Sequence, residues 1–186
     1  MKNEALEWRM YGLVPYNISP IQQAIQYGHA VVEYFNKYND DTVGGLFEWR
    51  TRDKTFIILN GGTTNGTINP KPKQSPPEYL GSLNNHLVSL FNNKVAFSSF
   101  YEPDLGDQLT ALVFLVDERV FDREKYPDFM SFLQQKLGGV TQMIRGDGYT
   151  KPLREEYSDY YQEWENIIGG PTNVWLIEFL KQFRLA

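Results

Sequence analysis

Two short runs of apolar residues constrain the fold of this chain more than any other feature. Thr55–Leu59 (TFIIL) and Leu109–Val116 (LTALVFLV) contain no charged residue, and apolar runs of this length are typical of strands inside a sheet. We expect the shorter run to be a central strand, covered on both of its faces. The two runs therefore predict a folded protein organised around a β-sheet.

A strand and a helix precede the first run. The segment Arg9–Tyr16 (RMYGLVPY) is expected to form a strand. Ser19 has the features of a helix N-cap, because Pro20 suits the first helical position and Gln22 completes a capping-box spacing. The spacing predicts that this helix continues to about Tyr38.

Two stripes of residues run along this predicted helix. We expect the apolar stripe to face the core and the glycine within it to allow a close approach to the sheet. The polar stripe beside it is expected to form the wall of a site, where the start of the helix meets the ends of the strands. The apolar stripe is Ile21, Ile25, Gly28, Val32 and Phe35, and the polar stripe is Gln22, Gln26, His29 and Glu33.

The remaining elements complete a mixed sheet. Spacing predicts a helix over 80–91 and strands over 95–101 and 109–116, so the first two thirds of the chain read β-α-β-α-β-β. The βαβ crossovers require parallel pairs, whereas the last two strands can form a hairpin. Helices are predicted at about 126–137, 154–168 and 174–183. We therefore predict a single α/β domain over 1–186, in which a four-stranded core (9–116) carries a packed helical extension (117–186).

Composition narrows the classes of function. The net charge is −5 and the basic residues are scattered, which argues against strong non-specific nucleic-acid binding. The absence of cysteine excludes disulfides, thiolate metal sites and cysteine nucleophiles. No targeting segment and no long apolar run is evident, so we expect a cytoplasmic protein of bacterial or phage type that does not enter a membrane.

Three motifs occur in a specific order along the predicted core. They are Ala24–Ala30 (AIQYGHA) on the first helix, the acidic turn Glu102–Gly106 (EPDLG), and Leu109–Leu112 (LTAL) at the start of the last strand. Over about 9–116 the chain resembles the class II (archaeal and eukaryotic type) peptidyl-tRNA hydrolases, which carry A-A-Q-x-x-H-A and V-T-A-L at these places. The segment 63–77 and the residues after Asp117 have no counterpart in that family.

The resemblance implies an activity and a set of site residues. Known members hydrolyse the ester that links a peptide to the tRNA 3′ end. The implied catalytic set is Glu102, Asp104, Gln22 and His29, and the implied substrate contacts are Gln26, Thr110 and Asp107. Glu102 or Asp104 would be the base that activates water, and Gln22, Gln26 and Thr110 would be hydrogen-bond donors.

The sequence departs from the family pattern in two places. Gln22 stands where the family has a lysine, so it can hydrogen-bond but supplies no cation. The turn that leads to the last strand is about four residues shorter than the family's turn, and the family's R-T-Q portion has no counterpart.

Structural roles compete with these functional ones. Gln22 fits a capping box, a helix histidine such as His29 is often held by backbone hydrogen bonds, and acids in a turn often serve the turn itself. The segment Asn60–Gly66 lacks the ending of a phosphate-binding loop and is expected to be a flexible loop. His86 is expected to be a surface residue of its helix.

Three functions therefore remain open. The first is an ester hydrolase that acts on peptidyl-tRNA or a related aminoacyl ester. The second is a catalytically degenerate binding or regulatory module. The third is a protein that binds or hydrolyses another small ligand. The corresponding partners are the tRNA 3′ end, a small ester or nucleotide, and a protein or second copy bound through 117–186. The acidic turn matches no metal-binding loop, and neither a metal nor a cofactor is predicted.

Overall fold

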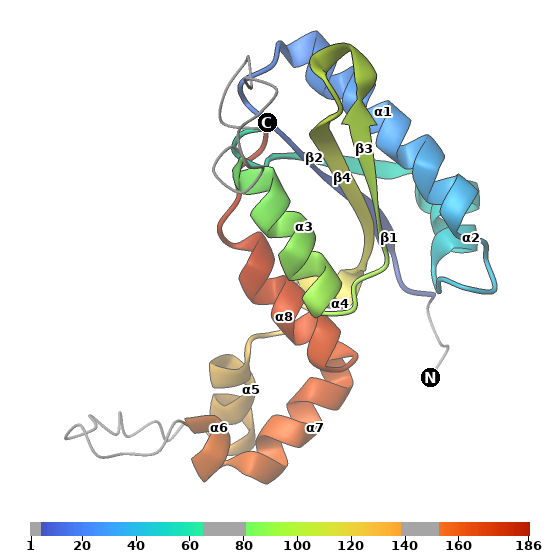
Figure 1. Ribbon diagram of the computed structural model, residues 1–186. Coiled ribbons are helices and arrows are strands. Elements are labelled where there is room, and N and C mark those ends of the chain that lie inside the picture. The colour runs from blue at the N-terminus through green and yellow to red at the C-terminus, as the bar shows by residue number, and fades with distance from the viewer. Residues whose placement is uncertain (1–4, 65–80, 139–152) are drawn as a thin grey trace. The chain divides into compact units, whose positions relative to one another are not determined.

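The computed structural model describes residues 5–64, 81–138 and 153–186 (Figure 1). It is an α/β protein with a four-stranded sheet in the order β2-β1-β4-β3. The strands are β1 (Trp8–Val14), β2 (Thr55–Asn60), β3 (Phe97–Glu102) and β4 (Gln108–Asp117). β1 is parallel to β2 and antiparallel to β4, and β4 is antiparallel to β3. The predicted β-α-β-α-β-β order and mixed sheet are confirmed.

The strands β4 and β2 differ in how they are covered. All ten residues of β4 are buried, because β4 has a strand on either side and helices over both faces. The prediction that β2 is central is wrong: β2 is at the edge of the sheet, and Phe56 is 52% exposed. The end of the chain pairs with this edge, since Asn60 N donates to Arg184 O at 2.9 Å and Ala186 N to Ile58 O at 3.0 Å. This pairing explains how an edge strand can lack charged residues.

Helices cover the two faces of the sheet. α1 (Pro20–Lys37) and the short α2 (Leu46–Glu48), which continues into the π-helical turn Trp49–Asp53, lie on one face, and α3 (Ser82–Asn92) lies on the other (Figure 1). The two sides follow the alternation of β1: Gly12 faces Tyr27 of α1, whereas Leu13 points to the side of Leu83 in α3.

The start of α1 is as predicted, but its buried face is not. Ser19 and Gln22 form the predicted capping box. The apolar stripe predicted to be buried is exposed, with Ile21 72% accessible and Val32 58% accessible. The residues buried against the sheet are instead Gln26, Tyr27, Ala30 and Tyr34.

Tyrosine explains this outcome. A tyrosine ring buries more apolar area than an aliphatic side chain of this stripe, and its burial costs least when the hydroxyl has a hydrogen-bond partner. The hydroxyl of Tyr27 donates to Met10 O at 2.8 Å, inside the core, whereas the buried hydroxyl of Tyr34 has no hydrogen-bond partner among the described residues. Ala30, between the rings of Tyr27 and Tyr34, keeps the helix close to the sheet.

Close approach of α1 to the sheet depends on a glycine other than the one predicted. A Cβ atom on Gly28 would have no atom within 4 Å, so the predicted role of Gly28 is wrong. A Cβ atom on Gly12 would lie 2.1 Å from Cε2 of Tyr27. The absence of a side chain in β1, and not in α1, therefore lets the helix and the sheet meet.

The described chain divides into two compact units. One contains the chain up to Glu118 together with Leu180–Ala186, and the other is Arg119–Phe179. The described residues of the second unit are mainly helical, as predicted. They form α5 (Phe129–Lys136), α6 (Leu153–Glu156), α7 (Ser158–Ile168) and all but one terminal residue each of α4 (Glu118–Phe121) and α8 (Pro171–Leu180). The predicted organisation as a single domain remains a prediction.

Aromatic packing holds the second unit together. The ring of Phe129 lies 5.1 Å from that of Tyr161 and 5.6 Å from that of Trp164, between centroids. The indole N–H of Trp164 donates to Pro127 O at 3.0 Å. Among the described helices, none is both long enough and apolar enough to cross a bilayer.

His86 does not have the surface position that was predicted for it. It is half-buried on α3, and its ring lies edge-on to the ring of Phe183, with centroids 4.8 Å apart. Burial lowers the pKa of the imidazole, and a backbone hydrogen bond with Gly61 partly opposes this shift.

The glycine argument predicts opposite effects at two positions. Gly12→Ala should destabilise the protein by about 1–3 kcal/mol, because the new methyl group overlaps the Tyr27 ring. Gly28→Ala should stabilise it by about 0.5–1 kcal/mol, because the site is open and alanine favours the helix. Urea unfolding followed by circular dichroism measures both. Equal effects of the two substitutions would contradict this packing.

The lowered pKa of His86 predicts a pH dependence of stability. The unfolded chain binds the His86 proton more readily than the folded protein, so the free energy of unfolding should fall as the pH drops below about 6.5. His86→Gln should reduce the loss between pH 7.5 and 5.5, measured by urea unfolding at each pH. An identical loss in the wild type and the variant would contradict the shift.

Candidate functional site

Strand directions bring most of the candidate residues to one edge of the sheet. β1 and β2 end at this edge, the antiparallel β4 begins there, and β3 ends there at Glu102. The first turn of α1 follows β1 at the same edge. The carboxyl ends of parallel strands are where open α/β sheets usually bind ligands.

Three of the predicted site residues meet through the side chain of Gln26. Its Nε2 donates to Oε2 of Glu102 at 2.5 Å, and its Oε1 accepts the hydroxyl of Thr110 at 3.0 Å. Gln26 is only 5% exposed and Thr110 is fully buried. One amide therefore connects α1 to β3 and β4, and a buried amide with both ends bonded is held in one orientation.

A β-bulge places Thr110 in this group. Phe100 pairs with Ala111 but Tyr101 pairs with Leu109, so Thr110 is an extra residue in β4. Ala111 belongs to the core cluster that contains Ala30 of α1. Two successive residues of β4 thus face α1, which regular alternation forbids and a bulge permits.

The carboxylate of Glu102 is held from two sides. Its Oε2 accepts from Gln26, and its Oε1 accepts Asp104 N at 3.3 Å. The side chain is partly exposed, at the mouth of the turn between β3 and β4. Each carboxylate oxygen has a second lone pair, so Glu102 can still accept a hydrogen bond from a water molecule.

Asp104 and Asp107 do not join this group. Both are exposed residues of the turn, and Asp107 N donates to Glu102 O at 3.0 Å. Asp107 has φ of +57°, a left-handed conformation that Asp tolerates in turns. In the structure both acids shape the turn that presents Glu102.

Gln22 and His29 flank Gln26 along α1. Oε1 of Gln22 accepts Ser19 N at 3.0 Å and Ser19 Oγ at 2.9 Å, so its acceptor is used by the helix cap. The imidazole of His29 is stacked on the ring of Phe100, with centroids 4.6 Å apart and planes 19° from parallel. Both side chains are exposed, one helical turn to either side of Gln26.

A second, partly buried network at this edge was not predicted. The hydroxyl of Thr64 donates to Oε1 of Gln108 at 2.9 Å and accepts Nδ2 of Asn17 at 3.2 Å, while Thr64 N donates to Oδ1 of Asn17. Gln108 is the first residue of β4 and pairs with Glu102 across the ladder. No motif marks these residues, and their only signal is that Gln108 is polar at the start of an apolar strand.

The loop after β2 is only partly described. At Asn60–Thr64 the chain is hydrogen-bonded to its neighbours and Thr64 is 2% exposed. This first part of the predicted flexible loop is therefore packed against the edge of the sheet. The rest of the predicted 63–77 loop lies outside the described residues, from 65 onward. Within the described ranges, no group of three or more histidine or acidic residues is placed to hold a metal ion.

Comparison of the sequence with models of protein families and with curated proteins finds no match. What can be said of the site therefore follows from its own chemistry. It offers a fixed, partly exposed carboxylate next to a buried hydroxyl and amide, without a cation among the residues that contact it.

The Gln26 bridge predicts a measurable cost when its partner is removed. Thr110→Val keeps the shape of the side chain but leaves Gln26 Oε1 buried without its donor, so the free energy of unfolding should fall by about 1–3 kcal/mol. Thr51→Val, at an exposed threonine of the first unit, should change it by less than about 0.5 kcal/mol. Urea unfolding compares them, and equal values would contradict a bridging role for Gln26.

Proposed function

We propose that this protein hydrolyses an ester of the peptidyl-tRNA type, with Glu102 as the general base. The observation that carries the proposal is the hydrogen bond between Gln26 and Glu102, which joins residues 76 positions apart in the chain. A general base must be held at a fixed place with a lone pair open to water. Glu102 meets this requirement better than either of the other acids in its turn.

The reaction needs one proton to move twice. Glu102 accepts a proton from water while the water oxygen attacks the carbonyl carbon of the ester. When the bond to the ribose oxygen breaks, the protonated Glu102 returns the proton to that oxygen. The products are the free peptide and a 3′-terminal hydroxyl. In this scheme Gln26 keeps Glu102 in place, and Thr110 keeps Gln26 in its orientation.

Two exposed side chains complete the proposed site. The amide nitrogen of Gln22 has no partner among the described residues, so it is available to donate to the developing oxyanion. Gln22 is neutral and stabilises that charge less than a lysine at its position. The stacked rings of His29 and Phe100 offer a flat surface beside Glu102, suited to an unpaired base at a tRNA 3′ end.

The hydrogen bonds between Gln22 and Ser19 favour a second function, in which the protein binds the ester without cleaving it. The side chain of Gln22 is tied to Ser19 in the helix cap and carries no charge. A protein that keeps the Gln26, Glu102 and Thr110 group without a cation would bind the same ester and leave it intact. Both the hydrolase and the binding protein would bind the ester, but only the hydrolase would cleave it. An assay that measures binding and cleavage together therefore separates the two functions.

Release of peptide from peptidyl-tRNA in single-turnover reactions tests the proposal. Glu102→Gln should lower the rate at least about 100-fold, because the base is removed while the shape is kept. The matched control is Asp107→Asn, which removes the same charge from the same turn and keeps a residue that tolerates positive φ. It should stay within about threefold of the wild type.

The variant Gln22→Lys adds the missing cation and should raise the rate about tenfold or more. Circular dichroism of each variant controls for loss of the helix cap. Equal rates for the wild type and Glu102→Gln would refute the role of Glu102. Binding of peptidyl-tRNA without release, in the wild type and in Gln22→Lys, would establish the binding module instead.

A further inference from the structure

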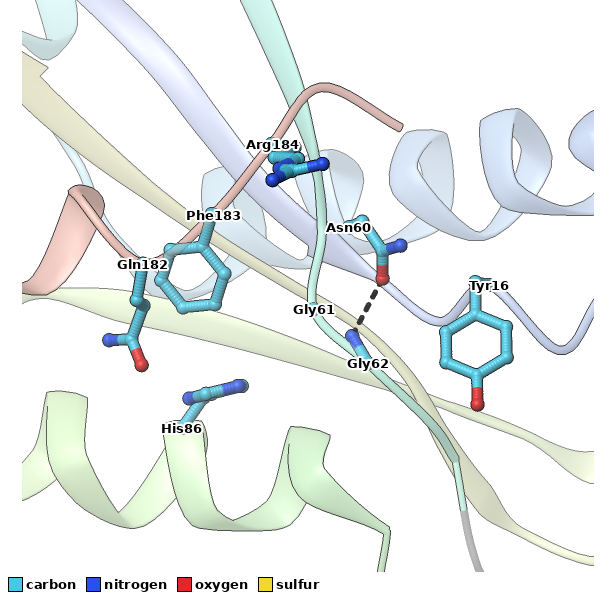
Figure 2. A pocket seen from close by; sticks show the side chains of 8 residues that line it. All are labelled: Tyr16, Asn60, Gly61, Gly62, His86, Gln182, Phe183 and Arg184. Atoms are coloured by element: carbon cyan, nitrogen blue, oxygen red, sulfur yellow. Dashed lines mark hydrogen bonds between the residues drawn. The ribbon is translucent and has the colours of Figure 1, made fainter.

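A pocket of about 330 Å³ lies at the carboxyl ends of β1 and β2 (Figure 2). It is lined by Tyr16, Asn60, Gly61, Gly62, His86, Gln182, Phe183 and Arg184. All of these residues belong to the unit that contains the sheet. Ligand pockets in proteins commonly begin at about 300 Å³, so this volume suits a small molecule and not a macromolecule.

The topology of the sheet explains why a hollow forms here. β1 and β2 are adjacent and parallel, but the helix after β1 covers one face of the sheet and the helix after β2 covers the other. The segments just after the strands stay paired, since Gly61 N donates to Val14 O and Tyr16 N donates to Gly62 O, both at 2.8 Å. The pocket lies beside this pair, at the carboxyl ends of parallel strands, which is the usual ligand position in open α/β sheets. The final residues of the chain close one wall, because Arg184 O accepts Asn60 N.

The pocket is chemically distinct from the Glu102 group. His86 is on α3, whereas Gln26 and Glu102 meet on the face covered by α1. None of the described residues that line the pocket is acidic, although the chain as a whole has a net charge of −5. The two centres therefore share an edge of the sheet but differ in charge.

The polar groups of the pocket are mainly donors. The guanidinium of Arg184, the hydroxyl of Tyr16 and Nδ2 of Asn60 have no hydrogen-bond partner among the described residues. Oδ1 of Asn60 is already used, since it accepts Gly62 N at 2.9 Å (Figure 2). Free donors in a described lining that holds no acidic side chain favour an anionic ligand.

An apolar surface completes the lining. The ring of Phe183 lies edge-on to His86, with 4.8 Å between centroids, so the two rings form one wall (Figure 2). Aromatic walls of this kind pack against flat ligand groups. The lining thus combines a cation and neutral donors with an aromatic wall.

We propose that this pocket binds a small organic anion in which a phosphate or carboxylate group is attached to a flat ring. The anionic group contacts Arg184 and Asn60, and the ring packs against Phe183. This site is independent of the proposed ester hydrolysis, because it uses none of the residues assigned to that reaction.

Calorimetric titration of the full-length protein with four probes tests the proposal. AMP and benzoate carry both a ring and a charge, adenosine carries the ring alone, and inorganic phosphate carries the charge alone. AMP or benzoate should bind with Kd below about 1 mM and at least tenfold more tightly than adenosine or phosphate. Which of the two binds more tightly distinguishes a phosphate ligand from a carboxylate ligand.

Two pocket variants and one control assign the binding to the pocket. Arg184→Gln should weaken the ring anion about tenfold and leave adenosine unchanged, because one charge-assisted contact is lost. Phe183→Leu should weaken both. Arg154→Gln removes the same charge from an exposed position in the second unit and should change nothing. Thermal unfolding confirms that each variant is folded.

Two results would overturn the proposal. The first is no saturable binding of AMP or benzoate by the wild type up to 10 mM, a range that covers about the weakest ligand affinities. The second is equal affinity of the wild type and Arg184→Gln for the ring anion. Neither result depends on ester hydrolysis, so a failure here leaves the Glu102 proposal to its own assay.

Discussion

Complete burial of β4 is the constraint on which the sheet unit depends. Its ten residues lie between β1 and β3 and under helices on both faces, so their backbone groups have no access to water and must bond within the sheet. This requirement fixes the register of β1 and β3 on either side. It also fixes where β4 begins, and therefore places Gln108 and Thr110 beside the end of β3.

The bulge in β4 shows how the fold relaxes that constraint at a single position. At Thr110 the ladder shifts by one residue, and the side chain turns to Gln26 instead of following the alternation. The interruption of the strand pairing is offset by the buried side-chain amide of Gln26, which is hydrogen-bonded at both its nitrogen and its oxygen. Since Gln26, Thr110 and Glu102 lie on a helix and two paired strands, the group they form is held more rigidly than one built on loops.

Chain direction gathers polar chemistry at one edge of this sheet and divides it between two faces. Glu102 lies on the side of α1, next to buried neutral groups. His86 and Phe183 lie on the side of α3, in a pocket whose described lining holds no acidic residue. Separation of a carboxylate from a set of free donors by the sheet itself lets one small unit present two electrostatically different surfaces.

The sequence by itself determined the order of the strands, the main helices between them and the start of α1, because apolar runs, helical spacing and a capping box are local patterns. Only the tertiary structure decided which residues of α1 are buried, since several stripes fit a helix and the choice depends on Tyr27, which packs against Gly12, and on the buried Tyr34. The motifs singled out Gln26, Glu102 and Thr110, and the structure brings these three side chains into one hydrogen-bonded group. Their junction, the network around Thr64 and the edge position of β2 arise from contacts between distant segments, which no local pattern encodes.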